Sequence, residues 1–419
     1  TVTNPKGFTA YIFITAAYWS FMLTDGALRM LVLLHFHILG FTPIQLTYLF
    51  LIYEIAGIAT NLYAGWIAAR FGLPTTLYAS LLFQVLALLA LAQLDPTWSI
   101  TASVVFVMTL QGLSGVAKDL TKMSAKSAVK ILAPSESEGL FRWVAILTGS
   151  KNSVKGAGFF LGGLLLAIFG FAPSLLAMAI ILLLILVGIL FSMPTGLPSG
   201  QKSINLSEIF SKSQKINLLS VARLFLFGAR DVWFVVGIPI YFYAVFSDGS
   251  DEGNRTAFFV IGAFMALWTI SYGIIQGWAP HFLKAQSRTD AQMLIQANRW
   301  VSFLVYVPSL LAISVWFSSE PSKALTAIII LGLIVFGIIF AVNSSLHSFL
   351  ILSFTNTDRV TMDVGFYYMA NAAGRLVGTV LSGLTYQLGG LPLCLCTAAI
   401  MIAFSLLATS KLIKRTTIA

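Results

Sequence analysis

The chain has 419 residues and a formal net charge of +10, with 58% hydrophobic and 10% charged residues. A soluble domain carries about 25% charged residues, so the composition excludes an ordinary soluble protein and indicates a polytopic membrane protein. The apolar segments are continuous, whereas the strands of outer-membrane barrels alternate in polarity, so we expect helices. Lysines and arginines in cytoplasmic loops explain the net charge better than nucleic-acid binding does, and no nucleic-acid partner is expected.

Twelve apolar segments of about 20 residues follow one another, and each is long enough to cross a bilayer. The sequence predicts an N-terminal six-helix bundle (1–193), a cytoplasmic linker (194–216) and a C-terminal six-helix bundle (217–419). The linker is polar and has no long apolar run. The predicted spans lie near residues 11–36, 43–68, 75–94, 98–119, 143–168, 173–193, 217–246, 256–279, 291–318, 323–350, 360–388 and 391–411.

Lysine and arginine are distributed unequally between alternate loops. If the N-terminus is cytoplasmic, most of them fall in inner loops, and the outer loops hold only Arg255 and Lys323. By the positive-inside rule both termini are then cytoplasmic, and the expected location is the cell inner membrane.

Charged side chains interrupt several of the predicted spans. An ionised side chain in hydrocarbon is costly, so it needs a water-filled cavity, an ionic partner or a ligand. Basic residues outnumber acidic ones among these side chains, so we expect the protein to handle an anionic solute. The residues are Asp25, Arg29, Glu54, Lys151, Lys155, Arg230, Asp231 and Arg375.

The first two spans carry carboxylates near their middle. Asp25 and Glu54 are candidates for proton coupling, as is Asp231 in the seventh span, because carboxylates that change their access to water are common proton carriers. Arg29 follows Asp25 by four residues, a spacing that allows the two to pair within one helix. Arg29 is also a candidate for substrate binding.

The end of the fourth span carries a lysine at every fourth position, at Lys118, Lys122, Lys126 and Lys130. On a helix this spacing places the four lysines on one face. One interpretation is a basic helix that lies along anionic lipid headgroups. The other is a funnel that gathers anions at the inner opening, with Lys118 closest to the substrate.

The fifth span is the most polar. Over about two helical turns it carries Lys151, Asn152 and Lys155 together with three hydroxyl groups. The lysines lie too deep to extend to the surface, so we expect them to face a polar cavity. In the alternative interpretation, Lys151 pairs with Asp25 or Glu54 and only holds two helices together.

The seventh and eleventh spans carry arginines. Glycines flank Arg375, and we expect them to leave room for its guanidinium to bind phosphate, carboxylate or arsenate oxygens through two hydrogen bonds. Asn371 lies one turn earlier and is expected to add donors on the same face. Arg230 and Asp231 are adjacent, so we expect their side chains to point about 100° apart. Cations from the two halves are expected to repel one another when no substrate lies between them.

Two short motifs resemble those of the major facilitator superfamily. Gly65–Gly72 resembles the loop motif Gly-x-x-x-Asp-Arg-x-Gly, with Ala69 at the acidic position. Gln111–Gly112 resembles the end of Arg-x-x-Gln-Gly, with Met108 at the arginine position. Spans five and eleven also share a glycine pattern. These features predict an all-α polytopic membrane protein of twelve transmembrane helices in two parallel six-helix repeats, the major facilitator fold.

Four longer segments carry a more specific resemblance: LTDGALRMLVLLHFH (23–37), AKDLTKMSAKSA (117–128), LTGSKN (147–152) and ARLFLFGARDVW (222–233). They resemble the ArsJ family of organoarsenical efflux permeases. The resemblance implies export of 1-arseno-3-phosphoglycerate, and a functional link to the glyceraldehyde-3-phosphate dehydrogenase that makes this compound from arsenate. It assigns no binding residues.

The expected function is secondary export of this anionic organoarsenical by alternating access, with a monomer as the working unit. The alternatives are an organophosphate, sugar-phosphate or drug antiporter and, in a different class, a non-transporting membrane receptor. Nucleotide-binding, metal-cluster and nucleophile motifs do not stand out, so neither an enzyme nor a cofactor is expected. The substrate-binding candidates are Arg29, Lys118, Lys151, Asn152, Lys155, Arg230, Asn371 and Arg375.

Overall fold

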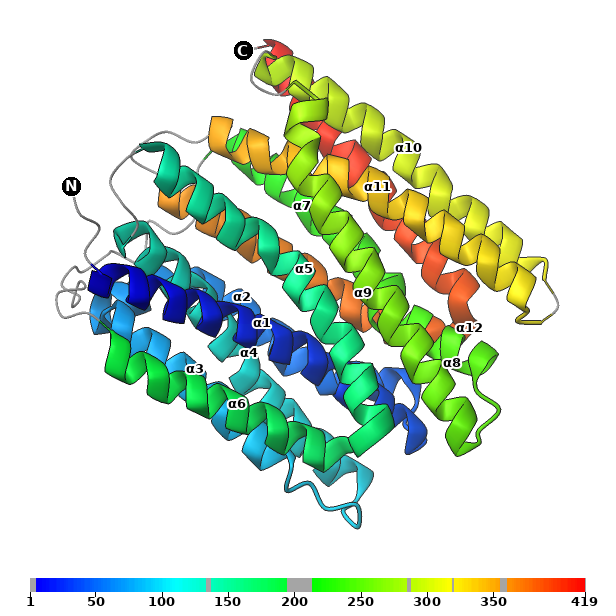
Figure 1. Cartoon of the computed structure of the whole chain (residues 1–419). Helices are drawn as coiled ribbons and strands as arrows, with labels where there is room; N and C mark the ends of the chain where they lie inside the picture. Colours follow the sequence, from blue (N-terminus) through cyan, green and yellow to red (C-terminus); the bar gives the residue numbers. More distant parts are fainter. Residues whose placement is uncertain are drawn as a thin grey trace.

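The computed structural model describes residues 5–132, 137–193, 213–284, 288–318, 320–354 and 360–418, and the secondary structure of these residues is helical. Figure 1 shows the helices running roughly side by side. They are α1 (Pro5–Ile38), α2 (Pro43–Phe71), α3 (Leu73–Leu91), α4 (Ile100–Leu132), α5 (Ser137–Phe169), α6 (Phe171–Ser192), α7 (Gln214–Val232), the π-helical segment η2 (Trp233–Gly237), α8 (Ile238–Phe246), α9 (Asp251–Phe282), α10 (Asp290–Trp316), α11 (Lys323–Phe354) and α12 (Val360–Ile418).

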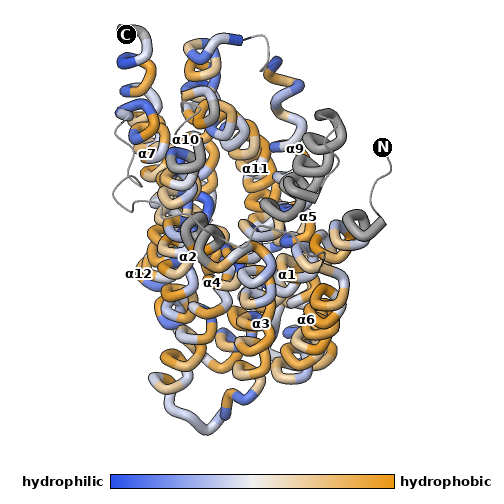
Figure 2. The backbone as a smooth tube through the Cα atoms, turned by 90° about the vertical axis from the view of Figure 1, so that its left-hand side faces the viewer, coloured by the Kyte–Doolittle hydropathy of each residue, from blue (hydrophilic) through white to orange (hydrophobic). Residues whose placement is uncertain are grey.

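Eleven helical stretches of the described chain are long and apolar enough to cross a membrane, and α7, η2 and α8 form one of them, Gln214–Phe246. Apolar residues predominate along these stretches in Figure 2. Large apolar side chains are exposed on the flanking helices, for example Leu184 on α6 and Tyr306 on α10. Exposed apolar surface of this extent is unusual for a soluble monomer. The chain is therefore a multi-pass membrane protein.

The last helix, α12, folds back on itself. Gly389 and Gly390 have non-helical dihedral angles, and the φ of Gly390 is 65°. The Cys394 Sγ lies 3.7 Å from the carbonyl oxygen of Ser382, whereas a straight helix would separate these residues by about 18 Å. Figure 1 shows the two arms as the orange and red parts of α12. The break falls between the last two predicted spans.

Helices α1–α6 pack mainly against one another, as do α7–α12, and the most extensive contacts between these two parts are those of α5 with α9 and of α2 with α12. Near the loop between α1 and α2, the Thr47 hydroxyl donates to the carbonyl oxygen of Thr379 at 3.2 Å. The Ile44 N–H donates to Gln387 Oε1 at 3.1 Å. In Figure 1, α3 and α6 lie on one flank of the molecule and α10 on the other, so the helices between them form the interior.

Glycines bring helix backbones close together at two crossings. A Cβ on Gly158 of α5 would lie 2.4 Å from the carbonyl oxygen of Leu23 in α1. A Cβ on Gly378 of α12 would lie 2.5 Å from the carbonyl oxygen of Gly228 in α7. Gly374 packs in the same way against Leu224. The glycines that flank Arg375 therefore allow close packing of α12 against α7.

Several predicted boundaries differ from the structure. Residues 65–71 are the last turns of α2, and only Gly72, with a φ of 83°, leaves the helix. Helix α4 continues beyond the predicted span to Leu132, and α5 begins at Ser137, ahead of its predicted span. Helix α7 begins at Gln214, inside the predicted linker. The rest of that linker, residues 194–212, and the side chains of Lys126 and Lys130 lie outside what the structure describes.

Candidate functional site

A fully buried carboxylate joins the two parts of the molecule. Glu54, on α2, has 0% side-chain exposure. Its Oε1 lies 3.0 Å from Nη2 of Arg29 on α1, and its Oε2 lies 3.4 Å from Nη2 of Arg375 on α12. One carboxylate thus pairs with an arginine of its own part and with an arginine of the other part. The expected pairing of Arg29 with Asp25 does not occur.

Asp25 instead pairs with the fifth helix. Its Oδ2 lies 3.2 Å from Nζ of Lys155 on α5, and its Oδ1 accepts a 2.6 Å hydrogen bond from the Tyr53 hydroxyl. The side chain of Asp25 is 2% exposed, so these partners replace water. Lys155 therefore links α5 to α1 through this carboxylate. Lys151 lies one turn earlier on α5 and is half-buried.

A third group of charges lies beside the first two. Lys118, on α4, places its Nζ 4.3 Å from the centre of the Tyr53 ring and 3.8 Å from Asp119 Oδ2. Lys122 pairs with the same carboxylate at 3.2 Å. A Cβ on Gly57 of α2 would meet Asp119, Arg375 and Lys118 within 3.9 Å. Charged side chains of α4 and α12 therefore converge beside Gly57 of α2.

In the other part of the molecule, Arg230 pairs with its neighbour. Its Nη2 and Nε lie 2.6 Å and 2.7 Å from Asp231 Oδ1. Our expectation that these side chains point apart was wrong, because the long arginine side chain bends back to the carboxylate. The Arg230 guanidinium also lies over the rings of Phe227 and Phe340, at 5.0 Å and 5.7 Å from their centres. The pair adjoins the π-helical segment η2, and π-helical turns are frequent at functional sites.

Arg223 was missed by the sequence analysis as a site residue, although it lies inside a predicted span. Its Nε donates to Asn371 Oδ1 at 2.9 Å, and its Nη1 donates to the Ser344 hydroxyl at 2.8 Å. Asn371 is thus an acceptor for Arg223, and the structure does not show it adding donors beside Arg375. The signal that would have found Arg223 is the one used for the other charges, an ionised side chain within an apolar segment.

Asn152 lies at the contact between α5 and α9. Its Nδ2 is 3.5 Å from Gln276 Oε1, and Gln276 Nε2 donates to the Ser344 hydroxyl at 3.1 Å. A Cβ on Gly273 would lie 2.9 Å from the Cβ of Asn152. A chain of polar side chains therefore connects α5 through α9 to α11, and from there to Arg223.

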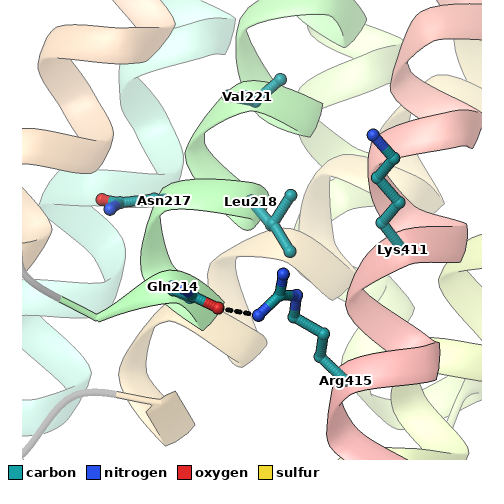
Figure 3. A pocket seen from close by; sticks show the side chains of 6 residues that line it. All are labelled: Gln214, Asn217, Leu218, Val221, Lys411 and Arg415. Atoms are coloured by element: carbon teal, nitrogen blue, oxygen red, sulfur yellow. Dashed lines mark hydrogen bonds between the residues drawn. The ribbon is translucent and has the colours of Figure 1, made fainter.

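The cavity shown in Figure 3 lies elsewhere. It has a volume of about 310 Å³ and is formed by residues of α7 and of the last turns of α12. Arg415 is hydrogen-bonded to Gln214 there. The predicted site residues do not line this cavity, so it has no part in the candidate site. Among the described residues, no three His, Cys, Asp or Glu side chains come together as a metal site.

Solved membrane transporters have a similar fold. The nucleoside transporter NupG, in an aspartate-to-alanine mutant, has a TM-score of 0.70 at 14% identity, with 97% of this chain and 98% of that chain covered. A POT family transporter in complex with a thioalcohol-conjugated peptide has a TM-score of 0.69 at 14% identity, over 95% and 94% of the two chains.

A third match is a POT family transporter in complex with 5-aminolevulinic acid, with a TM-score of 0.68 at 14% identity over 98% and 97% of the two chains. No protein-family model and no curated protein sequence matches the chain. At this identity the likeness shows the fold alone. The chain therefore has a fold like that of these solved transporters.

Proposed function

We propose that the protein is a secondary transporter that exports an anionic phosphorylated organoarsenical, 1-arseno-3-phosphoglycerate, and so confers resistance to arsenate. It crosses the cell inner membrane twelve times, with the two arms of α12 as the last two crossings and both termini cytoplasmic. Its two six-helix halves alternate access to a central site. It acts as a monomer, and a glyceraldehyde-3-phosphate dehydrogenase supplies its substrate.

One observation carries the proposal: the junction of Glu54 with Arg29 and Arg375 at mid-depth in the helices. Intramembrane charges are costly, and they mark substrate or ion pathways when they face the interior of a bundle. Here the charges come from both halves, so relative movement of the halves must change their pairing. That is the property alternating access requires of a substrate site.

The sign of the charge favours an anionic substrate. In the interior ion pairs of the described chain, six basic side chains meet four carboxylates, and buried Arg223 and Asp363 add one of each. Arginine binds phosphate and arsenate oxygens through two parallel hydrogen bonds. The same chemistry would bind an organic phosphate without arsenic, so exchange of organic or sugar phosphates is the second candidate. The choice of an organoarsenical depends on the resemblance to the ArsJ permeases.

The test is arsenic accumulation in cells that lack other arsenic exporters. Cells that express the chain together with the dehydrogenase, and receive arsenate, should contain several-fold less arsenic than cells with the dehydrogenase alone. The chain without dehydrogenase should give no decrease, because no organoarsenical is made. A chain with Arg375→Ala is the control, and it should reach the membrane but lose the effect.

Two results would decide against the proposal in different ways. Equal arsenic content with and without the chain, in the presence of the dehydrogenase, would exclude organoarsenical export. Exchange of glycerol 3-phosphate across proteoliposomes by the same chain would then establish the organic-phosphate candidate. Proton coupling through Asp25, Glu54 or Asp231 belongs to the proposal and is tested separately below.

A further inference from the structure

Arg223 differs from the other interior cations in its partners. Within the described chain, Arg29, Lys118, Lys155, Arg230 and Arg375 each have a carboxylate within 4 Å. Arg223 is 4% exposed, and within the described chain it donates hydrogen bonds to the neutral oxygens of Asn371 and Ser344. A buried positive charge without a counter-charge is costly. The position is therefore one at which an anion from outside the chain would be stabilised.

The Arg223 guanidinium is fixed by two aromatic rings and by hydrogen bonds, and one of its nitrogens, Nη2, remains available to a ligand. Its guanidinium carbon lies 3.9 Å from the centre of the Phe227 ring and 5.1 Å from that of Tyr367. Nε and Nη1 are occupied by their acceptors, while Nη2 has no hydrogen-bond partner among the described residues. An arginine fixed between rings, with free donors, is preorganised for an oxyanion.

Unpartnered polar groups lie on α11, the helix whose Ser344 accepts a hydrogen bond from Arg223. Asn343 and His347 are four residues apart and so lie on one face of this helix, and His347 lies about one turn after Ser344. Asn343 is 0% exposed and His347 is 1% exposed. Neither the amide atoms of Asn343 nor the ring nitrogens of His347 have a hydrogen-bond partner within the described chain. His347 is close enough to Arg223 to interact with its charge.

We propose that Arg223, Asn343 and His347 form a second oxyanion subsite, which takes a phosphate, arsenate or carboxylate group of the substrate. The inference rests on the proposed function, because it assigns the two ends of one substrate to two places. The first end lies at the cations around Glu54, and the second lies at Arg223. Unpartnered buried polar atoms cost free energy in the empty protein, and an oxyanion accepts hydrogen bonds from all three side chains.

The spacing suits a short substrate. Arg223 and Arg230 are seven residues apart on α7, about 10 Å along the axis. Asn371, which touches Arg223, and Arg375 are four residues apart on α12, about 6 Å. A three-carbon compound with an oxyanion at each end has a length in this range. Gln276 and Asn152 connect the subsite to α5 through hydrogen bonds, so an anion bound at the subsite would affect helices of both halves of the molecule.

The experiment measures ligand affinity of the purified protein, from the thermal stabilisation that ligand binding gives. The probes are 3-phosphoglycerate, which has two anionic groups, and glycerol 3-phosphate, which has one. Wild-type protein should bind 3-phosphoglycerate at least about tenfold more tightly, because its second anionic group gains charge-assisted hydrogen bonds at the subsite. His347→Leu should lose this preference and bind both probes with similar affinity. Arg223→Lys should weaken it as well.

These variants distinguish an effect on ligand binding from an effect on folding. Replacing an unpartnered buried polar group by an apolar one of similar size should not lower the stability of the empty protein, so His347→Leu should fold. Ser405→Ala is the matched control. Its buried hydroxyl donates to the Ala222 carbonyl next to Arg223, and the variant should keep the wild-type preference.

Each outcome has a defined meaning. If neither probe stabilises the wild-type protein, the proposed handling of phosphorylated anions fails. If the wild type binds both probes equally, or if His347→Leu keeps the tenfold preference, the second subsite is overturned while the proposed function stands. A lost preference in His347→Leu with the preference retained in Ser405→Ala supports the subsite, even where Arg223→Lys does not fold.

Discussion

Replacing Glu54 by glutamine should loosen the contact between the two halves. Glu54→Gln keeps the size and shape of the side chain but removes the charge shared by Arg29 and Arg375. Both arginines then lose the carboxylate with which they form salt bridges, and they repel each other. The amide can still accept one hydrogen bond, so the change tests the charge rather than the packing.

The magnitude follows from the geometry. At the 3.4 Å separation of Arg375 and Glu54, the direct attraction is about 5 kcal/mol at an effective dielectric constant of about 20. Part of it is offset by the desolvation of the two groups. Removing one partner of a buried pair costs about 3–5 kcal/mol, because the other charge is left uncompensated. We therefore expect a loss of about 3 kcal/mol or more.

The assay is a double-mutant cycle on the thermal stability of the detergent-purified protein, with Glu54→Gln, Arg375→Gln and the double variant. The double variant should be more stable than the sum of the two single losses predicts, by at least about 1 kcal/mol. Glu252→Gln is the matched control. Glu252 is exposed in the first turn of α9, and its replacement should change the stability by less than about 1 kcal/mol.

Two results would refute the reasoning. One is a Glu54→Gln variant as stable as Glu252→Gln, which would show that the bridge contributes nothing to the folded arrangement. The other is strict additivity in the cycle with Arg375→Gln. The contact across the halves would then be geometric proximity without energetic coupling.

Three further predictions follow from the same geometry. Gly378→Ala should destabilise the protein by about 1–3 kcal/mol relative to Gly277→Ala, because its Cβ meets a backbone oxygen whereas that of Gly277 meets nothing within 4 Å; equal thermal stabilities would contradict this. Arg375→Lys keeps the charge but loses the planar fork, so transport should fall about tenfold or more, and wild-type transport would remove the bidentate assignment. If protons drive export, Glu54→Gln or Asp25→Asn should abolish its dependence on a pH gradient, and unchanged dependence in both variants would exclude these carboxylates as carriers.

The sequence predicted the membrane spans well because their signal is local. About 20 consecutive apolar residues are sufficient to identify a span, and the break at Gly389 falls where two spans were separated. Helix ends were predicted less well. Residues 120–132 continue α4 beyond the apolar segment, because helix formation depends on backbone hydrogen bonds and continues through polar residues outside the hydrocarbon.

The pairing of the charges could not be predicted. Asp25 and Arg29 have the spacing of a pair within one helix, yet each pairs with another helix. The choice depends on which helices pack together, and that is set by close approaches such as the one at Gly158. A single sequence shows which residues are charged and how deep they lie, but the neighbours of each helix face appear only in the fold.

These pairings change the argument about the empty transporter. From the sequence, cations of the two halves were expected to repel one another and to disfavour the closed arrangement without substrate. In the structure, Arg375 is drawn to Glu54 of the other half, so the empty protein supplies its own anion at the junction. A substrate oxyanion that binds Arg375 must compete with Glu54. The displaced carboxylate keeps Arg29 as its partner at 3.0 Å, so the exchange leaves no buried charge alone. Binding of an anionic substrate would thus replace the salt bridge between Glu54 and Arg375 by a contact between Arg375 and the substrate. The halves would become free to move only when the site is occupied.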